Sequence, residues 1–275
     1  MIVSELFKKC KDILEAADVE SSAFEVSVMM EDLISLPKSA EMIIPDQEVS
    51  DEKCEKMILS SQKRASGYPL QYIVGNWEFY GRKFLVGENV FIPRQDTELL
   101  CECAIKFFKG IKSPKIIDLC SGSGCIAVTL SEEIADSDVT AVELYKGAFE
   151  YLCKNVKLHG DKVKTRNEDA LEPFGLFDGI VSNPPYITGE EMKCLQTEVT
   201  FEPETALFGG EDGLYFYREI TKRWKPHLVD GGFLGYEIGD AESGDVVKIL
   251  LDEGFKDVHV HKDLAGFDRV VTGRK

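Results

Sequence analysis

From residue 94 to the C-terminus, short apolar segments typical of buried strands alternate with longer segments that have helical spacing. The clearest strand patterns are KIIDLC (115–120) and FDGIVSN (177–183). Further strands are predicted at 138–144, 162–166, 232–239, 256–262 and 268–273, and helices at 97–109, 146–159 and 242–253. Such alternation predicts an α/β domain with a mainly parallel sheet and helices on both faces.

The residues before this domain have a different pattern. Residues 1–70 carry apolar side chains at helical spacing and show no strand-like alternation, so we expect a small helical domain there. Residues 71–93 are rich in aromatic and β-branched residues, interrupted by Gly75, Gly81 and Gly87. This pattern predicts a β-hairpin linker, after which the α/β domain occupies residues 94–275.

Charge and composition exclude several classes of protein. The chain has 32 Lys and Arg against 49 Asp and Glu, a formal net charge of −17, which disfavours broad binding to nucleic acid or anionic membrane. No stretch of about 18 apolar residues and no signal-peptide pattern occurs, so we expect a cytoplasmic protein. The eight cysteines form no C-x-x-C pair and the four histidines are scattered, so we expect no metal site.

A glycine turn follows the first strand of the α/β domain. In DLCSGSGCIA, Gly122 and Gly124 come between a strand and a helix, where they allow close approach of the backbone to a ligand. Glu143 ends the next strand, 19 residues after Gly124, the position from which a carboxylate accepts hydrogen bonds from ribose hydroxyls. This arrangement fits a dinucleotide or S-adenosylmethionine.

Two further carboxylates help to distinguish a dinucleotide site from an S-adenosylmethionine site. Asp118 lies beside the turn, where it would attract the ammonium and sulfonium of S-adenosylmethionine and repel the pyrophosphate of a dinucleotide. Asp169 follows the third strand and is placed to accept a hydrogen bond from an adenine amine, with Ala170 available for backbone contact. The pattern therefore favours S-adenosylmethionine.

The most specific signal is Asn183-Pro184-Pro185-Tyr186, at the end of the fourth strand. In an open α/β sheet, ligands bind beyond the carboxyl ends of the strands. The prolines supply no N–H and hold their carbonyls rigidly, Asn183 offers a side-chain carbonyl, and Tyr186 offers an aromatic face. This combination suits a planar NH₂ group.

The chemistry that follows is N-methylation. The Asn183 side chain and the Pro184 carbonyl can accept both N–H bonds of an amide or aromatic amine and direct its lone pair toward a methyl donor. No His or Lys base is evident in the sequence. None is required before transfer, because the methylated cation loses its proton easily.

At this point the chain resembles the HemK-type (PrmC family) methyltransferases, which modify the N5 amide of glutamine in peptide chain release factors. NPPY alone would also fit enzymes that methylate adenine or cytosine, but the later segments are more selective. The similarity is carried by PLQYIVGNWEFYGRKFLVGENVFIPR, DLCSGSGCIA, NPPYI, FEPETALFGGEDGLYFYREI (201–220), GGFLGYEIG (231–239) and LAGFDRVVTGRK.

The resemblance implies a seven-stranded, Rossmann-like methyltransferase domain preceded by a helical substrate-docking domain. It also implies S-adenosylmethionine as cofactor, S-adenosylhomocysteine as product, and the glutamine of a Gly-Gly-Gln motif as acceptor. The residues expected to hold the cofactor are Asp118, Cys120, Ser121, Gly122, Ser123, Gly124, Glu143, Asp169, Ala170 and Asn183. Those expected to hold the glutamine are Asn183, Pro184, Pro185 and Tyr186.

The chain departs from the family pattern at three positions. Cys120 replaces a glycine, Glu143 replaces an aspartate, and Gln95 replaces a proline in the segment after Pro93. The last change leaves the roles of Arg94 and Asp96 open.

Several alternatives remain at this stage. A close one is the related branch that methylates a large-subunit ribosomal protein. A DNA or RNA amino methyltransferase is disfavoured by the charge and by the lack of a basic target-recognition domain. An NAD(P)-dependent oxidoreductase leaves NPPY unexplained, and a non-catalytic adaptor predicts damaged motifs, whereas the motifs here are intact.

We expect a monomer whose partner is a class I release factor, without direct contact to nucleic acid or membrane. The acidic chain would be steered toward a basic partner.

Overall fold

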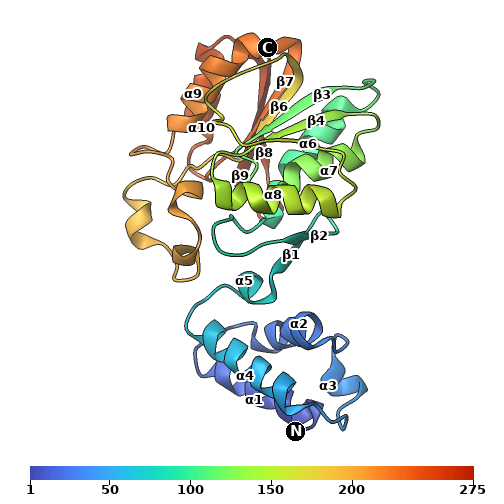
Figure 1. Ribbon diagram of the computed structural model, residues 1–275. Helices are drawn as coiled ribbons and strands as arrows, with labels where there is room; N and C mark the ends of the chain where they lie inside the picture. Colours follow the sequence, from blue (N-terminus) through green and yellow to red (C-terminus); the bar gives the residue numbers. More distant parts are fainter. The chain divides into compact units, whose positions relative to one another are not determined.

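The computed structural model describes residues 1–275. The chain divides into two units, and the first unit consists mostly of helices. This unit comprises Met1–Asn76 together with Gln196–Phe201. Its helices are α1 (Val3–Glu15), α2 (Ser22–Ile34), α3 (Ala40–Ile43), α4 (Asp51–Ala65), α5 (Leu70–Val74) and the 3₁₀ turn η3 (Val199–Phe201) (Figure 1).

The core of this unit is built from one face of each long helix. On α1 the buried side chains are Val3, Leu6, Cys10 and Leu14, which recur every three or four residues and therefore share a face. This face packs against α2 and α4. Ser50 begins α4 as its N-cap, with the side-chain oxygen accepting from the Lys53 amide at 3.4 Å.

Gln196–Phe201 joins this unit although it lies far along the chain. Arg64 of α4 is buried and binds Glu25 through two hydrogen bonds of 2.6 and 3.0 Å. The same guanidinium donates to Glu198 at 2.6 Å. Phe201 packs edge-on against Tyr68, with ring centroids 5.2 Å apart. A buried ion-pair network and an aromatic contact therefore attach this segment to α4 and the turn after it.

The second unit comprises Trp77–Leu195 and Glu202–Lys275. Within the predicted linker, 71–93, the paired strands β1 (Asn76–Phe79) and β2 (Arg82–Leu85) follow the short helix α5. Tyr80 and Gly81 both have positive φ, 52° and 69°, as a two-residue hairpin turn requires.

Seven strands form the sheet of this unit, in the order β5-β4-β3-β6-β7-β9-β8. Strand β9 is antiparallel to both of its neighbours, and the other pairs are parallel. The strands are β3 (Lys115–Leu119), β4 (Asp138–Val142), β5 (Lys164–Arg166), β6 (Phe177–Ser182), β7 (Leu228–Glu237), β8 (Lys256–Lys262) and β9 (Asp268–Arg274).

Helices cover both faces of the sheet. Ile116 of β3 lies in a core with α6, α7 and α8, whereas its neighbour Ile117 lies in a second core with α9 and α10, as the alternation of a strand requires. These helices are α6 (Glu98–Phe108), α7 (Cys125–Glu133), α8 (Lys146–Leu158), α9 (Tyr215–Trp224) and α10 (Ser243–Asp252). The remaining 3₁₀ turns are η1 (Gln95–Thr97), η2 (Glu191–Cys194), η4 (Glu204–Ala206) and η5 (Lys225–His227).

The predicted architecture, a helical region, a hairpin and a seven-stranded α/β domain, is confirmed. The chain runs outward from β3 through β4 to β5 and then returns to place β6 on the other side of β3. The order therefore reverses between β3 and β6, and the crevice beyond their carboxyl ends is where such sheets bind ligands. None of the helices has the length and apolar character needed to cross a bilayer.

Candidate active site

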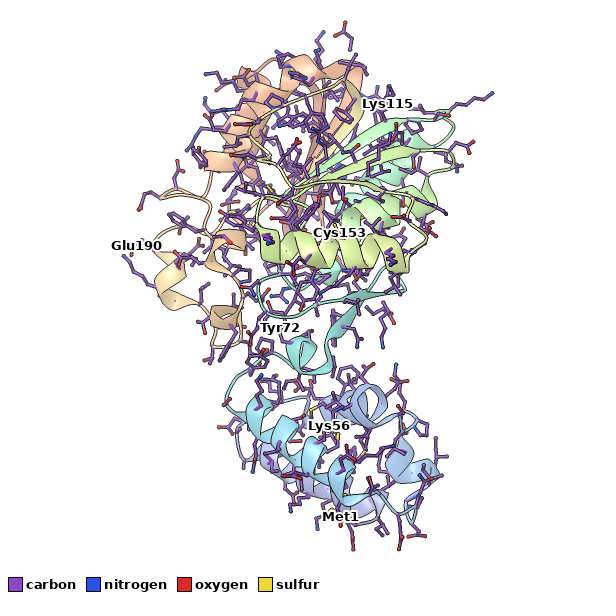
Figure 2. The ribbon with its side chains drawn as sticks, in the orientation of Figure 1. Met1, Lys56, Tyr72, Lys115, Cys153 and Glu190 are labelled. Carbon is purple, nitrogen blue, oxygen red and sulfur yellow. The ribbon has the colours of Figure 1, made fainter.

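The turn from β3 to α7 is held in the left-handed region of backbone space. Cys120, Gly122 and Gly124 have φ of 59°, 54° and 82°. A Cβ on Gly124 would lie 2.5 Å from Cδ1 of Leu152 on α8, the helix on which Figure 2 labels Cys153. A Cβ on Gly122 would meet nothing within 4 Å. Gly124 therefore permits helix packing, whereas Gly122 leaves open space at the turn.

Asp118 is a fully buried carboxylate without a partner inside the chain. Its exposed fraction is 0%, and neither Oδ1 nor Oδ2 has a hydrogen-bond partner. Burial raises the pKa of Asp118 to about 8, and interactions with the Ser121 hydroxyl and the Ala127 amide oppose part of this shift. A cation placed beside this acid stabilises its ionised form, as the sequence predicts for the ammonium or sulfonium of S-adenosylmethionine.

Glu143 is attached directly to the glycine turn. Its Oε2 accepts from the Gly122 amide at 2.9 Å, and its Oε1 accepts from the Tyr145 amide at 2.8 Å. Burial raises the pKa of Glu143, and these backbone amides oppose that shift. Each carboxylate oxygen retains a second lone pair, so this geometry remains compatible with hydrogen bonds from ribose hydroxyls.

Three predicted cofactor carboxylates converge on Cys120. Burial raises the pKa of the Cys120 thiol, and the charges of Glu143, Asp118 and Asp169 raise it further. Asp169 itself accepts from the Leu171 amide at 2.8 Å. The ends of β3, β4 and β5 thus bring together the acids that the sequence had placed on separate strands.

Several of the other predicted cofactor residues make hydrogen bonds within the protein. Ser121 donates from its hydroxyl to the Asp118 carbonyl at 2.8 Å, and the Ser123 carbonyl accepts from Asn155 at 2.9 Å. The Ala170 carbonyl accepts from the indole of Trp224 at 2.6 Å. These contacts hold the turn and the loop after β5 in place.

The register of the sheet places NPPY beside the glycine turn. Leu119 of β3 is paired with Ser182 of β6, so the next residues, Cys120 and Asn183, begin neighbouring loops. Nδ2 of Asn183 lies 3.4 Å from the Thr97 hydroxyl oxygen, to which it donates. Pro184 and Pro185 are buried, and Tyr186 is half-buried. The donor end of the Asn183 amide is therefore engaged, and its carbonyl end is available as an acceptor.

A glycine-rich loop, Phe208–Gly213, packs onto the NPPY backbone. The Ile187 amide donates to Leu207 at 2.8 Å, and the Gly209 amide donates back to Ile187 at 2.9 Å. A Cβ on Gly209 would lie 2.5 Å from the Tyr186 Cα and 2.6 Å from the Pro185 carbonyl oxygen. The resemblance included this segment but assigned it no role, because a contact between distant segments leaves no local pattern.

The two residues left open by the sequence both form ion pairs. Arg94 pairs with the buried Glu202, which also accepts from the Ile92 amide at 3.0 Å. Asp96 lies 3.6 Å from Arg269 at the start of β9. Arg94 and Asp96 therefore connect the entry to α6 with later segments of the same unit.

Two acids beside NPPY, one buried and one half-buried, were missed by sequence reasoning. Glu237 ends β7, and burial raises its pKa to about 7. Glu242 follows shortly after, accepts from the Gly239 amide at 3.0 Å, and also has its pKa raised by burial to about 7. The signal available was GYEIG at the end of a strand, which the resemblance included without a role for its acid.

Two family models match the chain, the PrmC N-terminal domain over residues 5–75 and the methyltransferase small domain over residues 94–207. The release factor glutamine methyltransferase of Fusobacterium nucleatum is 36% identical over 282 residues, covering 98% of this chain and 78% of that one. That of Clostridium botulinum is 34% identical and covers 100% of both chains. This chain belongs to the release factor glutamine methyltransferase family.

Solved structures agree with the fold of this family member. The hMettl16 catalytic domain, in complex with an RNA hairpin, superposes with a TM-score of 0.57 at 17% identity, covering 84% of this chain and 85% of that one. The T. thermophilus 16S rRNA N2 G1207 methyltransferase, in complex with AdoMet and guanosine, gives a TM-score of 0.51 at 19% identity, covering 73% and 49%. At these identities the likeness concerns the fold alone.

Membership of a methyltransferase family implies S-adenosylmethionine as the methyl donor, and the residues at the turn fit it. The unpartnered buried carboxylate of Asp118 suits a cationic ligand, and the space beside Gly122 allows close approach. Glu143 lies at the same turn with acceptor capacity to spare.

Proposed function

We propose that this protein transfers a methyl group from S-adenosylmethionine to the side-chain N5 amide of the glutamine in the Gly-Gly-Gln motif of class I release factors. The observation that carries the proposal is the pairing of Leu119 with Ser182, which sets Asn183 and Pro184 directly beside the glycine turn. The names of the full-length relatives support release factors as the class of substrate.

The protein's task at the acceptor is to bind a poor nucleophile in a reactive orientation. The lone pair of an amide nitrogen is delocalised, and methylation requires it to point at the methyl group. Because Nδ2 of Asn183 donates to Thr97, Oδ1 is the end that can accept one substrate N–H. The carbonyl of Pro184 accepts the other, and the buried prolines hold both acceptors in fixed positions.

At the donor side, Asp118, Gly122 and Glu143 would hold the cofactor. Bound S-adenosylmethionine supplies an electrophilic methyl group carried on a sulfonium. Asp118 favours the cationic ligand, Glu143 would accept from the ribose, and Asp169 and the Ala170 amide would be placed for the adenine. The ring of half-buried Tyr186 would cover the acceptor amide and limit access of water to it. The product nitrogen loses its proton readily, so no side-chain base is assigned.

A side-by-side methyl-transfer assay tests this function. Labelled S-adenosylmethionine is incubated with the purified protein and a class I release factor, a large-subunit ribosomal protein mixture, or DNA. We expect label on the release factor alone, and none on a release factor whose motif glutamine is replaced by alanine. Label on a ribosomal protein or DNA in place of the release factor would overturn the proposed substrate.

A further inference from the structure

Glu237 lies directly beside the acceptor site but has no role in the mechanism above. It is the last residue of β7, and its side chain is 2% exposed. Ser182 of β6 is paired with Tyr236 of β7, so the next residues on these parallel strands, Asn183 and Glu237, are neighbours. The Oε2 atom of Glu237 has no hydrogen-bond partner. An unpartnered carboxylate oxygen in a buried position is costly and is expected to acquire a donor in the working complex.

The donors that act on this carboxylate are the Thr97 hydroxyl and the Asn183 amide. Burial raises the pKa of Glu237 to about 7, while Thr97 and Asn183 both lower it by hydrogen bonding. Thr97 is itself 2% exposed and already accepts from Nδ2 of Asn183 at 3.4 Å. Glu237, Thr97 and Asn183 therefore form one polar group on three elements, β7, η1 and the loop after β6.

Other charged and titratable side chains act on this group. The guanidinium of Arg269 favours the ionised form of Glu237, and the carboxylate of Asp96 opposes it. Glu237 in turn raises the pKa of groups on the neighbouring elements, namely Tyr186, Cys101, Cys125 and Tyr217. Among these neighbours only Arg269 carries positive charge, and it is shared with Asp96 and Asp263.

A carboxylate in this place selects one orientation of the asparagine amide. An Asn side chain has a donor end and an acceptor end of nearly the same shape, and either can face the substrate. An ionised carboxylate accepts only. A Thr hydroxyl that donates to this carboxylate can only accept from its other neighbour. Both groups therefore attract the NH₂ end of Asn183 and leave Oδ1 facing the acceptor amide.

We propose that Glu237 is a positioning residue for methyl transfer, whose carboxylate binds the NH₂ end of the Asn183 side chain and so presents Oδ1 to the substrate amide. This inference rests on the proposed function. Glu237 does not touch the substrate and acts through Asn183. The Thr97 hydroxyl is the second group that binds the NH₂ end of Asn183. When Glu237 is protonated it can donate to Oδ1, which removes the preference and turns the acceptor away from the substrate.

The test compares Glu237→Gln and Thr97→Val with the control Glu150→Gln, which changes an exposed residue of α8. Values of kcat and of KM for the release factor are measured at saturating S-adenosylmethionine between pH 6 and 8.5. Misplacing an acceptor group costs about tenfold or more, so we expect such a fall in kcat for Glu237→Gln with KM within about twofold. Loss of one hydrogen bond predicts a fall of about two- to tenfold for Thr97→Val.

The pH profile separates positioning from a structural role. In the wild type, kcat is expected to rise as pH increases through about 7, because the ionised form of Glu237 is the one that orients Asn183. This limb is expected to be lost in Glu237→Gln. Glu242 has a pKa raised to about the same value but is present in both proteins, so the difference between the profiles reports Glu237.

Wild-type kcat in Glu237→Gln with an unchanged pH limb would overturn the inference, as would a rise in KM without loss of kcat. Should Glu237→Gln fail to fold, Thr97→Val decides, and wild-type kcat in that variant would contradict the role. A wild-type protein that does not label the release factor at all would instead contradict the proposed function.

Discussion

Asp118 is the residue whose environment most directly implies a ligand. Its carboxylate is buried without a partner, and its pKa of about 8 makes it mostly neutral at pH 7. A bound cation favours the ionised form. Binding at pH 7 is therefore coupled to release of a proton from Asp118, and affinity must rise as the solution becomes less acidic.

We predict that the Kd for S-adenosylmethionine falls between pH 6 and pH 8, by at most about tenfold per pH unit. Titration calorimetry in two buffers of different ionisation enthalpy should show proton release. In Asp118→Asn binding should be weaker and should lose the proton release, whereas the exposed control Asp161→Asn should behave as the wild type. Proton uptake on binding, or none in the wild type, would be incompatible with this role.

At the scale of elements, the acceptor site depends on a loop from another part of the chain. Gly209 brings Phe208–Gly213 against Tyr186 and Pro185 so closely that a Cβ would lie 2.5 Å from the Tyr186 Cα. Backbone atoms at such a distance cannot rotate away as a flexible side chain can. The loop must then move, and the NPPY backbone with it.

Gly209→Ala is accordingly expected to lower kcat about tenfold or more and to destabilise the fold by about 1–3 kcal/mol. Gly244 offers a matched control, since a Cβ there meets nothing within 4 Å and the residue lies inside α10. Gly244→Ala should keep its activity and gain up to about 1 kcal/mol in urea unfolding. Equal activity in the two variants would show that the loop does not set the acceptor geometry.

The features that could be predicted from the sequence are those that form local patterns within one element. The turn after β3, Glu143 and NPPY could be found because each is a local pattern at a strand end, and the mainly parallel sheet follows from the alternation of strands and helices. Glu237 and Gly209 could not, since their importance arises from the register of β6 with β7 and from the return of a distant loop. The attachment of Glu198 to Arg64 is equally non-local.

For the whole molecule, three acids whose pKa is raised by burial make stability depend on pH. Burial raises the pKa of Asp118 from 3.8 to about 8, and those of Glu237 and Glu242 from 4.5 to about 7. Between these pKa values each of the three carboxyl groups binds more protons in the folded chain than in the unfolded chain. The contribution of these three groups to the free energy of unfolding must therefore decrease as pH rises from about 4 to about 8.

Urea unfolding without cofactor should show this decrease between pH 5 and pH 8, with at most about 1.4 kcal/mol per pH unit from each group. Asp118→Asn should reduce the slope and raise stability at pH 8. Saturating S-adenosylmethionine should stabilise the wild type most strongly at the upper end of the range, where Asp118 ionises on binding. A free energy of unfolding that increases over this interval would contradict the raised pKa values of Asp118, Glu237 and Glu242.

The central claim is that Asn183, held beside the glycine turn, orients a release-factor glutamine for methylation. Peptide mapping of a class I release factor by mass spectrometry, after incubation with S-adenosylmethionine and either wild type or Asn183→Ala, tests it most directly. The account predicts one added methyl group on the Gly-Gly-Gln glutamine with the wild type. It predicts none with the variant, whose Kd for S-adenosylmethionine stays within a few-fold. A methyl group on another residue, or full methylation by Asn183→Ala, would contradict it.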